Sequence, residues 1–220
     1  MALPVLFRGI LKGSTTVEQQ VAASKRGSLF IQKDMPDYAQ LVKDNKVWSV
    51  TQTTATAAVI GSTFPTTACQ VALYNNESEG SGKIYVIIAV GAVQIAAGAA
   101  LAAWGIIYGV SQIKQTTLPT ADIAAASIRP MKGNGGAYPG RALVDLAPTL
   151  NVDPLYKPLP FGNSVNNPVN SLAGPMVSSA VHGLIVLPPS SLLALHVVAA
   201  DTGVTTLLSC IWAELDNDEF

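Results

Sequence analysis

An uncharged run, IYVIIAVGAVQIAAGAALAAWGIIYGV, extends from residue 84 to residue 110 and dominates the hydrophobic pattern of the chain. It exceeds the roughly 20 apolar residues that cross a bilayer, and Gly105 and Gly109 have the G-x-x-x-G spacing of packed membrane helices. The two ends of the run are rich in Ile, Val, Tyr and Trp, which favours buried strands. The run therefore predicts two strands joined by an Ala/Gly segment. A single membrane-spanning helix over 84–110 is the alternative.

Strand-like segments lie on both sides of this run. TFPTTACQVALYN alternates, which predicts a half-buried strand with Cys69, Val71 and Leu73 on one face. The later stretch GLIVLPPSSLLALHVVAADTGVTTLLSCIWAEL divides at Pro188-Pro189 and at 201–203 into three strands. Residues 47–220 thus predict an all-β domain, an antiparallel β-sandwich with long Pro- and Asn-rich loops at about 130–180.

Residues 1–46 are more polar, and no hydrophobic period persists through them. They predict an extended N-terminal arm with one short helix near Tyr38–Val42. Two apolar clusters interrupt the arm, and we expect both to contact neighbouring subunits. They consist of Leu6, Phe7, Ile10 and Leu11, and of Leu29, Phe30 and Ile31.

The composition narrows the classes of function. Charged residues make up 12% of the chain, against about 25% in an average globular protein. Such low charge indicates either a membrane or a surface buried against other subunits. The net charge is −1, so no basic excess is available to neutralise phosphates, and we expect no nucleic-acid partner.

No pattern in the chain points to catalysis. The only two histidines are His182 and His196, and His196 alternates with apolar residues, as a core or interface histidine does. The chain contains no H-E-x-x-H, G-x-S-x-G or P-loop pattern. The sequence therefore predicts a protein that is not an enzyme, with no catalytic residue, cofactor or metal ligand. Cys69 and Cys210 both lie in apolar stretches and are predicted to be buried free thiols.

Five apolar residues in the predicted strands are candidates for core or subunit-contact anchors. They are Trp48, Trp104, Leu195, Ile211 and Trp212.

Three segments carry a resemblance to a family of structural proteins of tailed-phage virions. They are DYAQLVKDNKVWSVTQTT, TFPTTACQVALYNNESEGSGKIYVI and the closing stretch that ends in Trp212-x-Glu214. The family pattern has a short arm, an opening strand with Val-Trp, an Asn-x-x-Ser-Gly-Lys turn and a closing strand pair after Leu-Pro-Pro. The resemblance covers about residues 38–115 and 181–215. The chain departs from the pattern at Ser190, where the family has glycine, and in its Ala/Gly-rich segment from Gly91 to Ala103.

The resemblance implies a jelly-roll-like sandwich that assembles into homo-oligomers on a phage particle, with trimers as the expected form. The implied function is that of a capsid decoration or cement protein located in the virion, on the capsid surface. Its partners would be the major capsid protein or other virion proteins. A tail adaptor or receptor-binding module of a phage is the alternative within the same family.

Overall fold

The uncharged run forms two strands, β4 (Lys83–Ala96) and β5 (Ala102–Ser111), in the computed structural model of the chain. A helix over 84–110 is therefore wrong. The β-branched residues at each end of the run pair with long neighbouring strands, so they contribute to sheets and not to a helix. None of the helices within the described residues has the length and apolar character needed to span a membrane.

The structure describes residues 38–59, 63–96, 102–111, 128–159, 165–167, 176–200 and 203–216. The seven residues of the two apolar clusters predicted in the arm lie outside these ranges. A short helix, α1 (Ala39–Lys43), lies close to the position expected from the sequence. Residues 41–220 form one compact unit, to which the following description applies.

The first sheet contains six strands, three of which are long. In spatial order it consists of β10 (Met176–Leu187), β4, β12 (Thr205–Asp216), β1 (Val47–Thr51) and β6 (Arg129–Pro130), with β2 (Thr56–Ala57) paired to β12. All of its pairs are antiparallel. The pairing of β10 with β4 is interrupted by a bulge between Ala180 and Ile185, and His182 and Gly183 in this bulge both have positive φ.

The second sheet also contains six strands. In spatial order it consists of β7 (Leu143–Leu146), β3 (Val71–Tyr74), β11 (Leu192–Ala199), β5 and β8 (Lys157–Pro158), with β9 (Val165–Asn167) paired to β5. These pairs are antiparallel as well.

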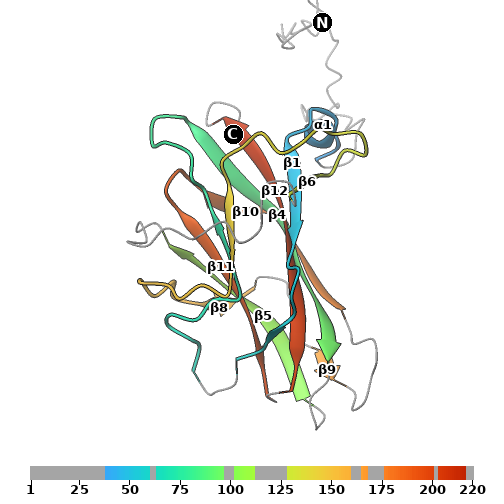
Figure 1. Cartoon of the computed structure of the whole chain (residues 1–220), viewed down its shortest axis with the longest axis vertical. Helices are drawn as coiled ribbons and strands as arrows, with labels where there is room; N and C mark the ends of the chain where they lie inside the picture. Colours follow the sequence, from blue (N-terminus) through green and yellow to red (C-terminus); the bar gives the residue numbers. More distant parts are fainter. Residues whose placement is uncertain are drawn as a thin grey trace, which may run out of the picture. The chain divides into compact units, whose positions relative to one another are not determined.

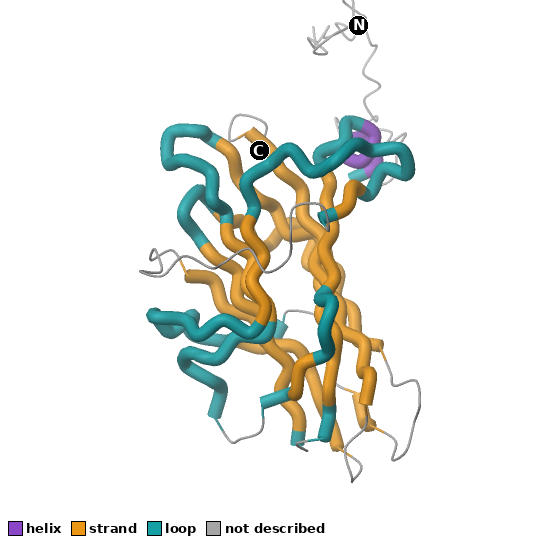
Figure 2. Tube along the Cα trace, in the orientation of Figure 1, coloured by secondary structure: helices purple, strands orange, loops and turns teal. Residues whose placement is uncertain are grey.

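The two sheets pack against each other (Figure 1). Strands account for most of the described chain, and α1 is the one helix within it (Figure 2). The predicted all-β antiparallel sandwich is confirmed. The jelly-roll-like connection of its strands stays a prediction. The predicted division of the closing segment is also confirmed, because β10, β11 and β12 are separated near Pro188-Pro189 and at 201–203.

The core between the sheets is built around three tryptophans, which are among the largest fully buried side chains of the described residues. Trp48 lies on β1, Trp212 on β12 and Trp104 on β5. Trp212 packs near the rings of Tyr138 and Tyr85, with centroid distances of 6.3 and 6.4 Å. Because each aromatic ring removes about 150–250 Å² from water, these side chains dominate the core.

Polar side chains join the two sheets inside the core. Gln70 precedes β3, and its Nε2 donates to Gln52 Oε1 at 3.1 Å and to the backbone oxygen of Thr206 in the first sheet at 3.0 Å. Trp104 Nε1 donates across the core to Gln94 Oε1 at 3.1 Å. Buried polar groups need such partners, so these bonds also fix how one sheet sits on the other.

Cys69 lies on the face opposite to the one predicted for it. Val71 and Leu73 point into the main core, whereas Cys69 packs with Ala72 on the outer side of the second sheet. The strict alternation begins only at Val71, because the chain bends at Gln70 before β3 starts. The prediction that both cysteines are buried free thiols is confirmed.

The segment predicted as long surface loops is less irregular than expected. It contains β7, β8 and β9, and β10 already begins at Met176. Leu150 and Tyr156 from this segment are buried against the outer side of the second sheet. Gly109 on β5 permits this cover, since a Cβ at that position would lie 2.5 Å from the Pro154 oxygen.

Replacement of Trp212 by alanine tests whether its side chain lies in the core between the two sheets. We expect Trp212→Ala to lower the free energy of unfolding by about 3–5 kcal/mol, because it leaves a cavity between the sheets. Ile211→Ala on the same strand is the matched control. Ile211 is half-buried on the opposite face, so its truncation should cost only about 1 kcal/mol. Urea unfolding followed by circular dichroism measures both, and equal losses would contradict the assignment.

Candidate functional site

Three regions of the described structure are candidates for a functional site: a buried carboxyl cluster, a groove beside β5 and an uncharged sheet face. No group of three or more His, Cys, Asp or Glu residues within the described ranges is arranged to hold a metal ion.

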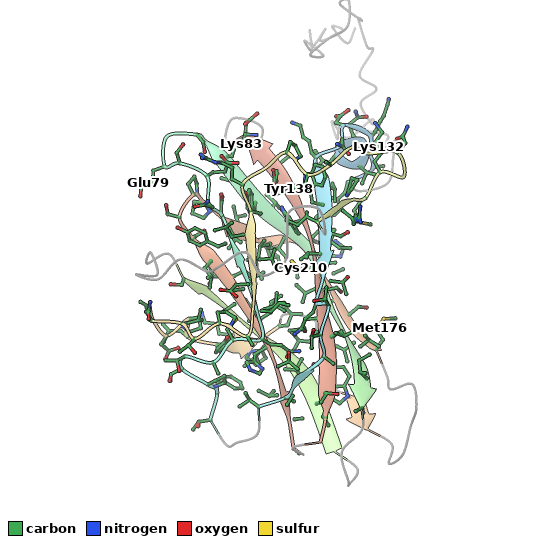
Figure 3. The ribbon with its side chains drawn as sticks, viewed as in Figure 1. Glu79, Lys83, Lys132, Tyr138, Met176 and Cys210 are labelled. Atoms are coloured by element: carbon green, nitrogen blue, oxygen red, sulfur yellow. The ribbon has the colours of Figure 1, made fainter. Side chains whose placement is uncertain are left out.

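The carboxyl cluster forms around Glu214 near the end of β12. The Trp-x-Glu spacing places Trp212 and Glu214 on the same face of the strand. Trp212 Nε1 donates to Glu214 Oε1 at 3.2 Å, and the Tyr138 hydroxyl donates to the same oxygen. The Tyr138 hydroxyl also accepts the backbone N–H of Ala142 at 2.9 Å. Figure 3 labels Tyr138 in this part of the molecule.

Burial shapes the electrostatics of this cluster. Desolvation raises the pKa of Glu214 above its ordinary value of 4.5, although the hydrogen bonds from Tyr138 and Trp212 and the charge of Lys83 act in the opposite direction. Desolvation also raises the pKa of Tyr138, and the neighbouring carboxylate raises it further. Tyr138 therefore stays protonated and acts as a donor. The arrangement ties the segment between β6 and β7 to β12, which is a structural role.

A second buried group lies on the outer side of the second sheet. The Tyr156 hydroxyl donates to the Ala68 oxygen at 3.0 Å, and the Tyr156 ring meets His196 edge-to-face at 6.5 Å. Burial lowers the pKa of His196 and raises that of Cys69 to about 12. At this buried position the neutral imidazole of His196 and the protonated thiol of Cys69 serve to pack the interior. His196 is 4% exposed, as a core histidine should be.

The groove lies between β5, the segment before β8 and the bulged part of β10. It has a volume of about 290 Å³, and its walls include Tyr108, Pro154 and Lys157. Leu155 and Leu184 face it and are 69% and 66% exposed. Only one of its lining side chains is charged, so it offers few polar groups to orient a small ligand.

The third candidate is the outer face of the first sheet, which points away from the core. The register aligns its residues in rows across β10, β4 and β12. The rows are Met176–Val93–Leu207, Ser178–Gly91–Ser209 and Ala180–Ala89–Ile211. No charged residue occurs at these nine positions, but the row of Ile211 continues through Ser49 on β1 to the exposed Arg129 on β6. A solvated face of an antiparallel sheet normally carries polar side chains, whereas only the middle row here is polar, with Ser178 and Ser209.

One end of this outer face is covered by other side chains of the chain, and the other end is exposed. Near α1, the side chains of Leu41 and Val42 pack on a cluster of buried residues. This cluster consists of Val47, Ile84, Val86, Ala213 and Leu215. At the other end, Met176 is 73% exposed and Ile95 is 46% exposed. Met176 lies at the border of the first sheet in Figure 3, away from Cys210 in the core.

The structure distributes the predicted anchor residues over both faces. Trp48, Trp104, Trp212 and Leu195 lie in the core between the sheets. Ile211 instead lies on the outer face of the first sheet, in the row with Ala180 and Ala89. The anchors therefore do not form one site.

Two features were missed by the sequence reasoning. The role of Glu214 could have been found from the Trp-x-Glu spacing, which puts a carboxyl beside a core tryptophan. The outer face could have been found from the absence of charge at alternate positions of residues 84–96, 176–187 and 205–213. Tyr138 gave no comparable signal, because its contact with Glu214 bridges 76 positions of the chain.

Comparison of the chain with protein-family models, with curated proteins and with solved structures finds no match.

Replacement of Glu214 by an isosteric amide tests the carboxyl cluster. Because the folded-state pKa of Glu214 is raised, the native state binds a proton that the unfolded state has already lost. This group therefore favours folding below its unfolded pKa, and its contribution falls as pH rises through the folded pKa. We expect the stability of Glu214→Gln relative to the wild type to rise as the pH increases above the ordinary glutamate value of 4.5. Urea unfolding at a series of pH values measures the difference.

Tyr138→Phe is the companion variant. It keeps the carboxyl but removes its hydroxyl donor, and it leaves the Ala142 N–H without its acceptor. We expect a loss of about 1–3 kcal/mol near neutral pH and a steeper pH dependence than in the wild type. A Glu214→Gln difference that stayed constant with pH would contradict the assigned role of the carboxyl.

Proposed function

We propose that this chain is a non-enzymatic structural protein of a tailed-phage particle. In this proposal it is a decoration or cement protein that forms homo-oligomers and contacts the major capsid protein or other virion proteins on the capsid surface. The observation that carries the proposal is the nested pairing of eight of its strands, which supports the fold that the sequence resemblance implies.

The nesting is visible when eight strands are taken in chain order: β1, β3, β4, β5, β9, β10, β11 and β12. The first pairs with the last, the second with the seventh, the third with the sixth and the fourth with the fifth. An antiparallel ribbon of this kind, folded into two sheets, supports a jelly-roll connection. Jelly rolls of eight strands are frequent in viral capsid proteins.

The distribution of charge is a second support. Apart from Lys83, Glu214 and Asp216 near one end, the three long strands of the first sheet carry uncharged residues on their outer face as well as in the core. A subunit that works inside an assembly can present such a face, because the assembly removes it from water. Fold alone does not determine function, so the proposal depends on this surface together with the resemblance.

Quantitative mass spectrometry of purified phage particles tests the proposal by measuring the number of copies of this chain per particle. The proposal expects the chain to copurify with the particles, in many copies and in a fixed ratio to the major capsid protein. A few copies per particle would favour the alternative of a tail adaptor or receptor-binding module. Absence of the chain from purified particles would contradict both.

The N-terminal arm provides a separate test of attachment. We propose that its two apolar clusters dock on neighbouring subunits, where each buried Leu, Ile or Phe contributes about 1.5–3 kcal/mol. Deletion of residues 1–35 should leave a folded β protein with unchanged circular dichroism that binds particles much more weakly, by at least about 100-fold. A truncated chain that is unfolded, or one that attaches normally, would contradict this role for the arm.

A further inference from the structure

We propose that Asn134 is a site of spontaneous deamidation, and that its conversion to isoaspartate releases the segment between β6 and β7 (residues 131–142) from the sandwich. Asn134 lies in this segment and is exposed, and Gly135 and Gly136 follow it. Asn134-Gly135 is the one Asn-Gly pair in the chain. The inference does not depend on the proposed function, because the reaction needs only the chain itself and water.

The reaction begins when the backbone nitrogen of Gly135 attacks the side-chain carbonyl carbon of Asn134. The new C–N bond closes a succinimide ring, the C–N bond of the side-chain amide breaks, and the nitrogen leaves as ammonia with the proton from Gly135. Water then opens the ring at one of its two carbonyls. Opening at the main-chain carbonyl gives isoaspartate, and opening at the side-chain carbonyl gives aspartate. Glycine favours the attack because it has no Cβ to crowd its nitrogen.

The fold itself requires the glycine that makes Asn134 reactive. A Cβ on Gly135 would lie 2.5 Å from Asn45 Oδ1 and 2.6 Å from the ring of Pro130. Because the proline ring is rigid, a larger residue at this position would displace the segment. One contact opposes the reaction, since the Gly135 N–H donates to the Lys132 oxygen at 2.9 Å. This bond must open first, which slows the attack about two- to tenfold relative to a free peptide.

Isoaspartate changes the length of the chain where the chain is held most tightly. Its backbone runs through the side-chain carbon and gains one C–C bond, about 1.5 Å, just before Gly135. Gly135 has no room for one more carbon on the side of Pro130, so it must move. Tyr138 follows closely, with its ring edge-to-face on Trp48 at 5.0 Å and its hydroxyl on Glu214. Displacement of the chain therefore loosens the contacts that hold this segment on the core.

Peptide mapping of the full-length chain tests the site, after ageing at neutral and at mildly alkaline pH. Trypsin releases the peptide 133–141, in which Asn134 is the only asparagine (Figure 3 labels Lys132, after which trypsin cuts). Cleavage before aspartates releases the peptide 145–152, in which Asn151 is the only asparagine. Asn151 is also exposed, but the β-branched Val152 follows it and crowds the attack. Electron-transfer fragmentation distinguishes isoaspartate from aspartate.

We expect Asn134 to convert at least about tenfold faster than Asn151, and faster at the higher pH, where the attacking nitrogen loses its proton more readily. A synthetic peptide of residues 133–141 should convert about two- to tenfold faster than the folded chain. An Asn134 amide that persists while the synthetic peptide converts would overturn the proposal. Equal rates at Asn134 and Asn151 would overturn it as well.

Limited trypsin digestion of the folded chain tests the release of the segment. Arg141 is exposed at its far end, and molecules with isoaspartate at position 134 should be cut there at least about tenfold faster than the fresh chain. Freshly purified Asn134→Asp is the matched control, because it adds the same charge at unchanged chain length, and it should be cut at the wild-type rate. Asn134→Ser cannot form the ring, so ageing should leave its cleavage unchanged. Isoaspartate without faster cleavage would overturn the proposed release, as would equally fast cleavage of Asn134→Asp.

Discussion

The pairing of β4 with β12 is the constraint on which the rest of the structure depends. These two long strands lie side by side in the first sheet and, apart from Lys83, Glu214 and Asp216 near one end, carry uncharged side chains on both faces. Their inner face buries Trp212 against the second sheet. Their outer face has no layer of its own at the Met176 end within the described residues, where Ile95 remains 46% exposed. Burial of one face thus stabilises the sandwich, whereas under the proposed function an assembly covers the other.

A few buried polar groups determine how the two sheets align in this largely apolar core. Hydrophobic burial alone does not fix how two sheets align, because it is non-directional. The bonds from Gln70 to Thr206 and from Trp104 to Gln94 each join one sheet to the other at defined positions. At the end of β12, Glu214 orients Tyr138 and thereby the segment that follows β6. These bonds fix the position of the first sheet relative to the second.

Sequence patterns predicted the strands well and the contacts between them poorly. Period-two alternation and the turn signals at Pro188-Pro189 located the boundaries between β10, β11 and β12, because these are local properties. The face of Cys69 was wrong, since a bend at Gln70 resets the alternation just before β3. The contact of Tyr138 with Glu214 could not be predicted, because it joins distant segments. The uncharged outer face could have been predicted from the composition of β4 and β12 once both were assigned as strands of one sheet.

The central claim is that the outer face of the first sheet is covered in the working protein. Hydroxyl-radical footprinting of the assembled chain tests it most directly, with each rate normalised to the same peptide in the denatured chain. Met176 and Leu155 are exposed to a similar extent in the isolated chain, and methionine oxidises readily. The account predicts strong protection of Met176 in the assembly while Leu155 keeps its rate. Oxidation of Met176 at the rate expected for an exposed side chain would contradict it.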